Sequence, residues 1–288
     1  MRHLPGPAGS TLAVHELGGE GRPTLLCHAT GFHGAVWEPF AKGLGEGFER
    51  WSMDFRAHGA SVVPESQPLD WDGFGDDVLA VVDGLGLPAG EVLGIGHSMG
   101  GAALLLAEQR RPGTFAGLWL YEPVTFPPGA AAALAGTAEG PNRLVEGAAR
   151  RRPSFPSAAD ALANFAAKPP FGVLRADALH AYVRHGFVPD DSPEARPGSV
   201  RLACRPADES QIYRGGPAHA AFAHLGEVAC PVVVAKGNDL AGPGPVAAAV
   251  ADALPHGRLE DFGVLSHFGP LEAPERTAAV AAAFARTL

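Results

Sequence analysis

The segment GHSMGG at residues 96–101 constrains the fold of this chain more than any other. The apolar run before it predicts a buried strand over 91–97, and the alanine- and leucine-rich run after it predicts a helix over 99–110. Ser98 therefore stands at a strand-to-helix turn within the pattern G-x-S-x-G. The backbone of such a turn is strained, and side chains two positions away on either side would collide with their neighbours, so glycine is needed there. The pattern predicts that the turn presents the Ser98 hydroxyl as a nucleophile; a glycine-rich packing turn with an incidental serine is the alternative.

Strand-like and helix-like segments alternate through most of the chain. The apolar run CPVVVAKG at 230–237 predicts a strand that is buried on both faces, and the final segment at 273–288 predicts a helix. This alternation predicts an α/β fold with a mostly parallel central sheet flanked by helices. Residues 126–226 interrupt it with proline clusters and helical patches. We therefore predict a core formed by residues 1–125 and 227–288, and a mostly helical cap inserted at 126–226.

Composition narrows the class of protein. The 288 residues are 46% hydrophobic, which is enough for one large core, and the formal net charge of −9 argues against a nucleic-acid partner. No apolar run is long enough to span a membrane, and the N-terminal residues lack the apolar stretch of a signal peptide. The three cysteines show no C-x-x-C spacing. The histidine pairs His180/His185 and His219/His224 are each five residues apart, so neither pair shares a helix face and a metal site is not expected. We therefore expect a cytoplasmic protein that acts on a small molecule without a metal or other cofactor; the sequence is silent on oligomeric state.

A nucleophilic serine needs a general base and a group that orients the base. His267 lies in a loop between the last predicted strand and the last predicted helix. Asp239 follows the valine-rich strand, at the carboxyl end where active-site groups gather in parallel sheets. Taken singly, His267 fits an ordinary loop histidine and Asp239 a solvated turn residue. The order Ser98, Asp239, His267, each after a predicted strand, indicates a catalytic triad.

Four blocks of sequence together resemble the α/β-hydrolase superfamily. They are similar to the family's H-G-x loop, its D-x-R-G-H-G-x-S loop, its nucleophile elbow, and its histidine loop with the final helix. In that order, the blocks are HATGFHGAVW (28–37), DFRAHGAS (54–61), GHSMGG (96–101) and LSHFGPLEAPERTAAVAAAF (265–284). The resemblance covers the predicted core and is far more specific for the fold than for a substrate.

The resemblance implies Ser98 as the nucleophile and His267 as the general base, with the backbone N–H groups of Thr30 and Met99 forming the oxyanion hole. The sequence departs from the family at Ala29, where a glycine is usual; this position affects the direction of the Thr30 N–H.

The second departure concerns the acid. The family's G-x-x-D is compressed to Gly237-Asn238-Asp239. Some members of the family carry the acid after the preceding strand, so Glu122 is the alternative, and we favour Asp239 over it. Asp261, within the last predicted strand, is a weaker candidate.

The implied activity is cleavage of a small or medium-sized ester, lactone or similar carbonyl compound through an acyl-enzyme at Ser98. Related hydrolases that open epoxides or remove halides use aspartate at this position, so the serine argues against those reactions. Two alternatives remain open: a carbon–carbon bond hydrolase or thioesterase that uses the same triad, and a ligand-binding member of the fold without turnover.

Aromatic and basic residues are candidates for contact with the substrate. Phe32 and Trp37 are predicted to line an acyl pocket or to belong to the core, and Phe126 is predicted to form a pocket wall beside the cap. The run Arg150–Arg152 could meet an acidic substrate, but such a run is more typical of a solvated helix face.

Overall fold

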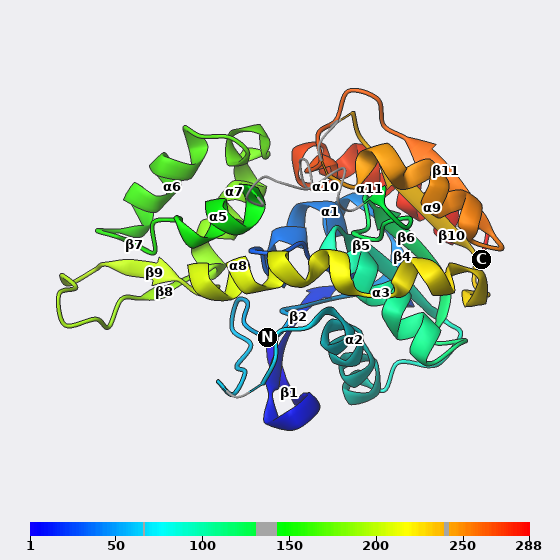
Figure 1. Ribbon diagram of the computed structural model, residues 1–288, viewed down its shortest axis with the longest axis horizontal. Coiled ribbons are helices and arrows are strands. Elements are labelled where there is room, and N and C mark those ends of the chain that lie inside the picture. Colours follow the sequence, from blue (N-terminus) through cyan, green and yellow to red (C-terminus); the bar gives the residue numbers. More distant parts are fainter. Residues whose placement is uncertain (66, 131–142, 239–241) are drawn as a thin grey trace.

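A computed structural model describes residues 1–65, 67–130, 143–238 and 242–288 (Figure 1). Its main feature is an eight-stranded sheet in the order β1-β2-β4-β3-β5-β6-β10-β11. β1 and β2 pair antiparallel, as do β2 and β4, and every other neighbouring pair is parallel. The strands are β1 (Arg2–Pro5), β2 (Thr11–Gly18), β3 (Gly21–Cys27), β4 (Gly47–Met53), β5 (Val92–His97), β6 (Phe115–Tyr121), β10 (Val232–Lys236) and β11 (Gly257–Asp261). This confirms the predicted fold class.

Helices cover both faces of the sheet and enclose two hydrophobic cores. On one face, α2 (Trp71–Leu85), α3 (Met99–Arg110) and α9 (Ala247–Ala253) form the α2/α3 core. On the other face, α1 (Glu38–Gly43) and α11 (Pro274–Ala285) pack together in the α1/α11 core. Successive residues of a strand point to opposite faces. In β10, Val232 and Val234 therefore enter the first core while Val233 enters the second, which explains the uninterrupted run of valines.

Further helices and short strands lie between β6 and β10 in the chain, and we call residues 143–215 the cap segment. It contains α5 (Arg143–Ala149), α6 (Ala158–Ala166), α7 (Ala176–His185) and α8 (Pro206–Gly215). It also contains a three-stranded antiparallel sheet of β7 (Ser154–Phe155), β9 (Val200–Leu202) and β8 (Phe187–Pro189). Strands of two or three residues are too short for a periodic pattern, so the sequence predicted only the helices.

The cap segment docks on the core through α7. Figure 1 shows α5, α6 and α7 gathered at one end of the molecule, at the left of the view. Leu179, Tyr182 and Val183 of α7 are buried in the α1/α11 core, so that core continues into the cap. Within the described part of the chain, no helix has the length and apolar character needed to cross a membrane.

Candidate active site

Ser98 occupies a strained turn between β5 and α3. Its backbone angles are φ 55° and ψ −113°, a region that residues other than glycine rarely adopt. A Cβ atom on Gly96 would lie 2.6 Å from Cα of Gly101, and one on Gly100 would lie 2.1 Å from the carbonyl oxygen of Cys27. Both flanking glycines are therefore required, as the sequence predicted. The close approach at Gly100 also packs the first turn of α3 against the end of β3.

Two backbone hydrogen bonds tie this turn to the end of β6. The N–H of Ser98 donates to the carbonyl oxygen of Tyr121 at 3.0 Å, and the N–H of Val124 donates to the carbonyl oxygen of Ser98 at 3.1 Å. Ser98 is 7% exposed. The serine is therefore held directly beside the residue that follows Tyr121, and it lies within the molecule rather than on an open surface.

That residue is Glu122, and it contacts the predicted base. Oε2 of Glu122 lies 2.5 Å from Nδ1 of His267, and Oε1 accepts the N–H of Gly237 at 2.8 Å. The Glu122 side chain is fully buried. A carboxylate at Nδ1 fixes the ring and its tautomer, which directs Nε2 to the reacting group.

The favoured acid of the sequence analysis, Asp239, lies outside the described residues. The alternative, Glu122, is the acid that the structure brings to His267. Asp261 is half-exposed and bonds to Lys236 and to the N–H of Gly263. The compressed turn after β10 contributes a backbone donor, the N–H of Gly237, to the Glu122 carboxylate.

His97 holds the loop that carries His267. The ring of His97 donates from Nε2 to the carbonyl oxygen of His267 at 2.7 Å, and the two ring centroids are 4.9 Å apart. Burial lowers the pKa of His97 well below its usual value, so this ring is neutral near pH 7. From the sequence alone, His97 is interpreted as a residue for packing or support beside the nucleophile. Its contact with the His267 loop could have been inferred from its position, because His97 ends β5 directly before the nucleophile and that end of the strand faces the histidine loop.

The predicted oxyanion donor Thr30 lies in a tight turn. The N–H of Phe32 donates to the carbonyl oxygen of Ala29 at 3.1 Å, and Gly31 has a φ of 78°, as the third residue of a type II turn requires. We call residues 29–32 the oxyanion turn. Ala29 itself is not among the residues with positive φ, so its methyl group causes no backbone strain. The departure from the family's glycine is therefore compatible with the turn.

Two buried histidines fix the hydrogen bonds of the oxyanion turn from the core side. His58 accepts the N–H of Gly31 at Nε2 (3.0 Å) and donates from Nδ1 to the carbonyl oxygen of Arg56 (2.9 Å). His28 likewise donates from Nδ1 to the carbonyl oxygen of Ala29 at 2.7 Å and accepts the N–H of Phe55 at Nε2 (3.1 Å). Both roles need a neutral ring with the proton on Nδ1. Burial lowers the pKa of His58 to about 4, so His58 is neutral across the physiological range.

The two predicted oxyanion donors come from segments in contact. A Cβ atom on Gly100 would lie 2.8 Å from the carbonyl oxygen of His28, which places the start of α3 beside the oxyanion turn. Met99 is the first residue of α3, so its N–H has no acceptor within the helix. A helix N-terminus also favours a developing negative charge.

The aromatic candidates separate into different environments. Phe32 contacts Phe171 and Tyr182 of the cap segment, and it contacts Phe268 beside the histidine loop. Phe32 therefore lies between the cap and the site. Trp37 is 1% exposed and packs edge-on against Phe40 in the α1/α11 core, which gives no support to a contact with substrate. Phe126 is partly buried, four residues after Glu122.

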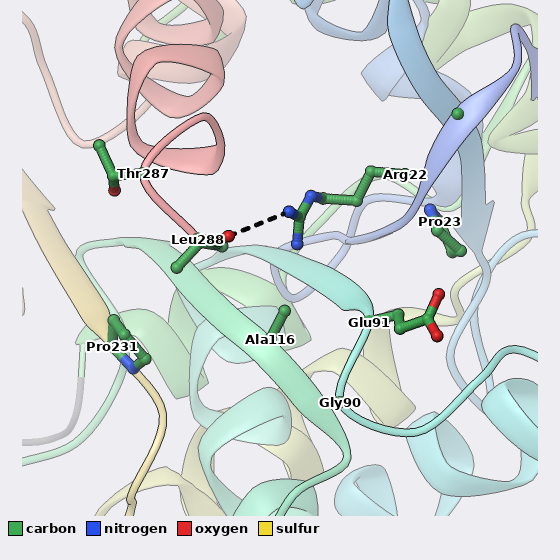
Figure 2. A pocket seen from close by; sticks show the side chains of 9 residues that line it. Arg22, Pro23, Gly90, Glu91, Ala116, Pro231, Thr287 and Leu288 are labelled. Atoms are coloured by element: carbon green, nitrogen blue, oxygen red, sulfur yellow. Dashed lines mark hydrogen bonds between the residues drawn. The ribbon is translucent and has the colours of Figure 1, made fainter.

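A hollow of about 610 Å³ lies at the amino ends of the parallel strands, at the other end of the sheet from Ser98 (Figure 2). It is lined by residues at the amino ends of parallel strands, including Arg22 and Pro231, and by the C-terminal Leu288. Arg22 donates to the carbonyl oxygen of Leu288 at 3.4 Å. Active sites of open parallel sheets lie at the carboxyl ends of the strands, where Ser98 is found. This hollow is therefore separate from the candidate site.

Comparison with known proteins agrees with the observed fold. Residues 24–280 match the Alpha/beta hydrolase family, and the chain belongs to that family. Human monoglyceride lipase is 34% identical over 135 residues, which are 44% of this chain and 44% of the lipase. The match thus spans less than half of that relative.

Solved structures share the fold across nearly the whole chain. E-2-(acetamidomethylene)succinate hydrolase has a TM-score of 0.79 at 22% identity, covering 98% of this chain and 97% of that one. A thermophilic esterase from Thermogutta terrifontis has a TM-score of 0.71 at 20% identity, covering 99% and 98%. Est816, described as an N-acyl homoserine lactone degrading enzyme, has a TM-score of 0.69 at 20% identity, covering 98% and 100%.

The buried histidines lead to a prediction about acid stability. His58 binds a proton with a pKa of about 4 in the folded chain and about 6.5 in the unfolded chain. Between these values the unfolded state holds more protons, so this contribution to the free energy of unfolding falls as the pH drops from about 6.5 to 4. In urea titrations between pH 5 and 6, the free energy of unfolding is plotted against pH. His58→Gln is expected to reduce the slope of this plot by about 1 kcal/mol per pH unit. An unchanged slope would show that His58 is already protonated in the folded state.

Proposed function

We propose that this α/β-hydrolase cleaves small or medium-sized carboxylic esters and lactones through an acyl-enzyme on Ser98. The observation that carries the proposal is the pairing of the buried Glu122 with His267, beside the strained Ser98 turn. Ser98 is bonded through its backbone to Tyr121, which precedes the acid, and it follows His97, which bonds the His267 loop. Hydrogen bonds made by these residues and their chain neighbours therefore join all three groups.

In the proposed reaction, Oγ of Ser98 attacks the carbonyl carbon while Nε2 of His267 takes the hydroxyl proton. Glu122 stabilises the imidazolium through Nδ1. The carbonyl oxygen becomes an oxyanion that accepts hydrogen bonds from the N–H groups of Thr30 and Met99. The C–O bond of the tetrahedral intermediate breaks, and His267 returns its proton to the leaving alcohol. Water then attacks the acyl-enzyme by the same route, which releases the acid and restores Ser98.

Several facts support an ester-type substrate. The similar proteins include a monoglyceride lipase, an esterase and an enzyme that degrades a lactone. The contacts of Phe32 with Phe268 and with cap aromatics provide an apolar wall for an acyl chain beside His267. The three cysteines are free and buried, which supports a reducing, cytoplasmic setting.

A fluorophosphonate probe tests the proposal directly. Ser98 is expected to displace fluoride from phosphorus and form a stable adduct, which peptide mass spectrometry would locate on the peptide that contains Ser98. Heat-unfolded protein is the control, because labelling requires the assembled site. A folded wild-type protein that stays unlabelled, and that hydrolyses neither p-nitrophenyl acetate nor an acyl thioester, would instead support the ligand-binding alternative.

A further inference from the structure

The three consecutive arginines of the cap segment have three different surroundings. Arg150 is exposed and pairs with Glu146 at 3.2 Å, as expected for a solvated helix face. Arg152 lies over the ring of Phe155. Arg151 points inward, and its side chain is 16% exposed. The sequence interpretation of a solvated face therefore describes Arg150 but not Arg151.

Arg151 belongs to a buried polar cluster inside the cap. Its Nη1 donates to Oε2 of Glu209 and its Nη2 donates to the hydroxyl of Tyr182, both at 2.5 Å. The guanidinium lies over the rings of Phe165 and Phe171, with 5.6 Å to each centroid. A buried ion pair loses hydration that the attraction between its charges barely replaces, and apolar side chains would fill the same space at less cost. The stability of the cap alone therefore does not account for the cluster.

The ion pair rests on the oxyanion turn. A Cβ atom on Gly31 would lie 2.6 Å from Oε1 of Glu209 and 3.2 Å from Nη1 of Arg151. Tyr182 contacts the next two residues: its ring packs on Phe32 at 5.1 Å, and its carbonyl oxygen accepts a hydrogen bond from His33. The cluster therefore touches three consecutive residues of the loop that carries the proposed oxyanion donor Thr30.

The same turn is also held by a side chain of the core. His58 accepts the N–H of Gly31, while Glu209 fills the space where a side chain of residue 31 would be. We propose that the Arg151–Glu209 pair is a positioning device that, together with His58, holds the oxyanion turn in place and so fixes the direction of the Thr30 N–H. The inference rests on the proposed function of Ser98. A role for Arg151 as an anchor for an anionic substrate is less favoured, because Glu209 already neutralises its charge.

This assignment has a kinetic signature. Donors that are preorganised for the oxyanion act mainly in the transition state, so loosening them lowers kcat and leaves KM nearly unchanged. A fluorophosphonate samples the same geometry, because its P=O oxygen must enter the oxyanion hole during labelling. The rate of labelling is therefore a second readout that does not depend on the natural substrate.

The experiment compares three variants with the wild type. Removing only one charge would leave the other buried and unpaired, so the main variant is the double substitution Arg151→Met/Glu209→Ala. We expect it to lower both kcat for p-nitrophenyl acetate and the labelling rate by about 10–100-fold, with KM changed by less than about threefold. Glu209→Gln retains atoms over Gly31 but leaves Arg151 without its counter-charge, so its kcat and labelling rate are expected to fall between those of the wild type and the double variant. Arg150→Met is the matched surface control and is expected to behave as wild type.

Other outcomes overturn the inference. A lower Tm with wild-type kcat and labelling rate, measured well below that Tm, would show that the pair only stabilises the cap. A raised KM for the p-nitrophenyl monoester of succinate, with acetate hydrolysis unchanged, would identify Arg151 as an anion anchor instead. Failure of the wild type to label would contradict the proposed function itself, so the two failures are distinguishable.

Discussion

Replacing Ser98 with alanine is expected to lower kcat for p-nitrophenyl acetate by about 10⁴-fold or more. Alanine removes the only atom of this residue that can attack the carbonyl carbon, and no acyl-enzyme can form without it. Labelling by the fluorophosphonate should disappear in the same variant. Both effects are measured on protein whose circular dichroism and Tm match those of the wild type.

The matched variant is Ser98→Cys, which retains a nucleophile at the strained turn. It should acquire acyl groups from activated esters and turn them over slowly, because a thiolate attacks well but the pocket is shaped for oxygen. If Ser98→Ala retained more than a tenth of the wild-type activity, hydrolysis would take place without this serine and the proposed mechanism would fail.

The second large effect is expected at the acid. The Glu122 carboxylate accepts two hydrogen bonds, from His267 and from the N–H of Gly237. In Glu122→Gln only one oxygen remains, so the amide NH₂ group must oppose one of these two donors. If the NH₂ group faces Nδ1 of His267, the ring loses its acceptor or its correct tautomer; if it faces the N–H of Gly237, that buried donor is left unpaired. In both cases the negative charge that stabilises the imidazolium is lost, and we expect kcat to fall by about 10³–10⁴-fold, as measured with p-nitrophenyl acetate.

The control for this prediction is Asp239→Asn, which removes the acid that the sequence favours. If Glu122 is the triad acid, this variant should retain kcat within about threefold of wild type. The reverse result, a severe loss at Asp239 and a mild one at Glu122, would restore the order Ser98, Asp239, His267 and would reject the assignment of Glu122.

Most of the central sheet was predictable because its pattern is local. The valine run of β10 is buried on both faces, so the sequence shows it without any knowledge of partners. The strained turn at Ser98 was predictable for a similar reason, since the glycines that it needs stand two residues away. Both predictions therefore depend on residues that lie within a few positions of one another along the chain.

The acid was harder to predict because it depends on a contact between distant residues. Glu122 and Asp239 both follow parallel strands, β6 and β10, that are neighbours in the sheet. The choice between them depends on which carboxylate reaches His267, 145 positions from Glu122 along the chain. For the same reason, the sequence could not separate Arg151 from Arg150, because only tertiary packing buries one and exposes the other.

The segment Tyr121–Val124 connects every proposed catalytic group just before the chain leaves for the cap. Its backbone bonds Ser98 twice, its glutamate bonds His267, and a Cβ on Gly101 would lie 2.9 Å from the side chain of Pro123. The proposed catalytic groups Ser98, Glu122 and His267 thus all lie outside the cap segment, residues 143–215. A chain organised in this way is modular in evolution: the inserted segment can diverge and recruit new substrates, provided that it still seats on Gly31, while the machinery below it is inherited intact.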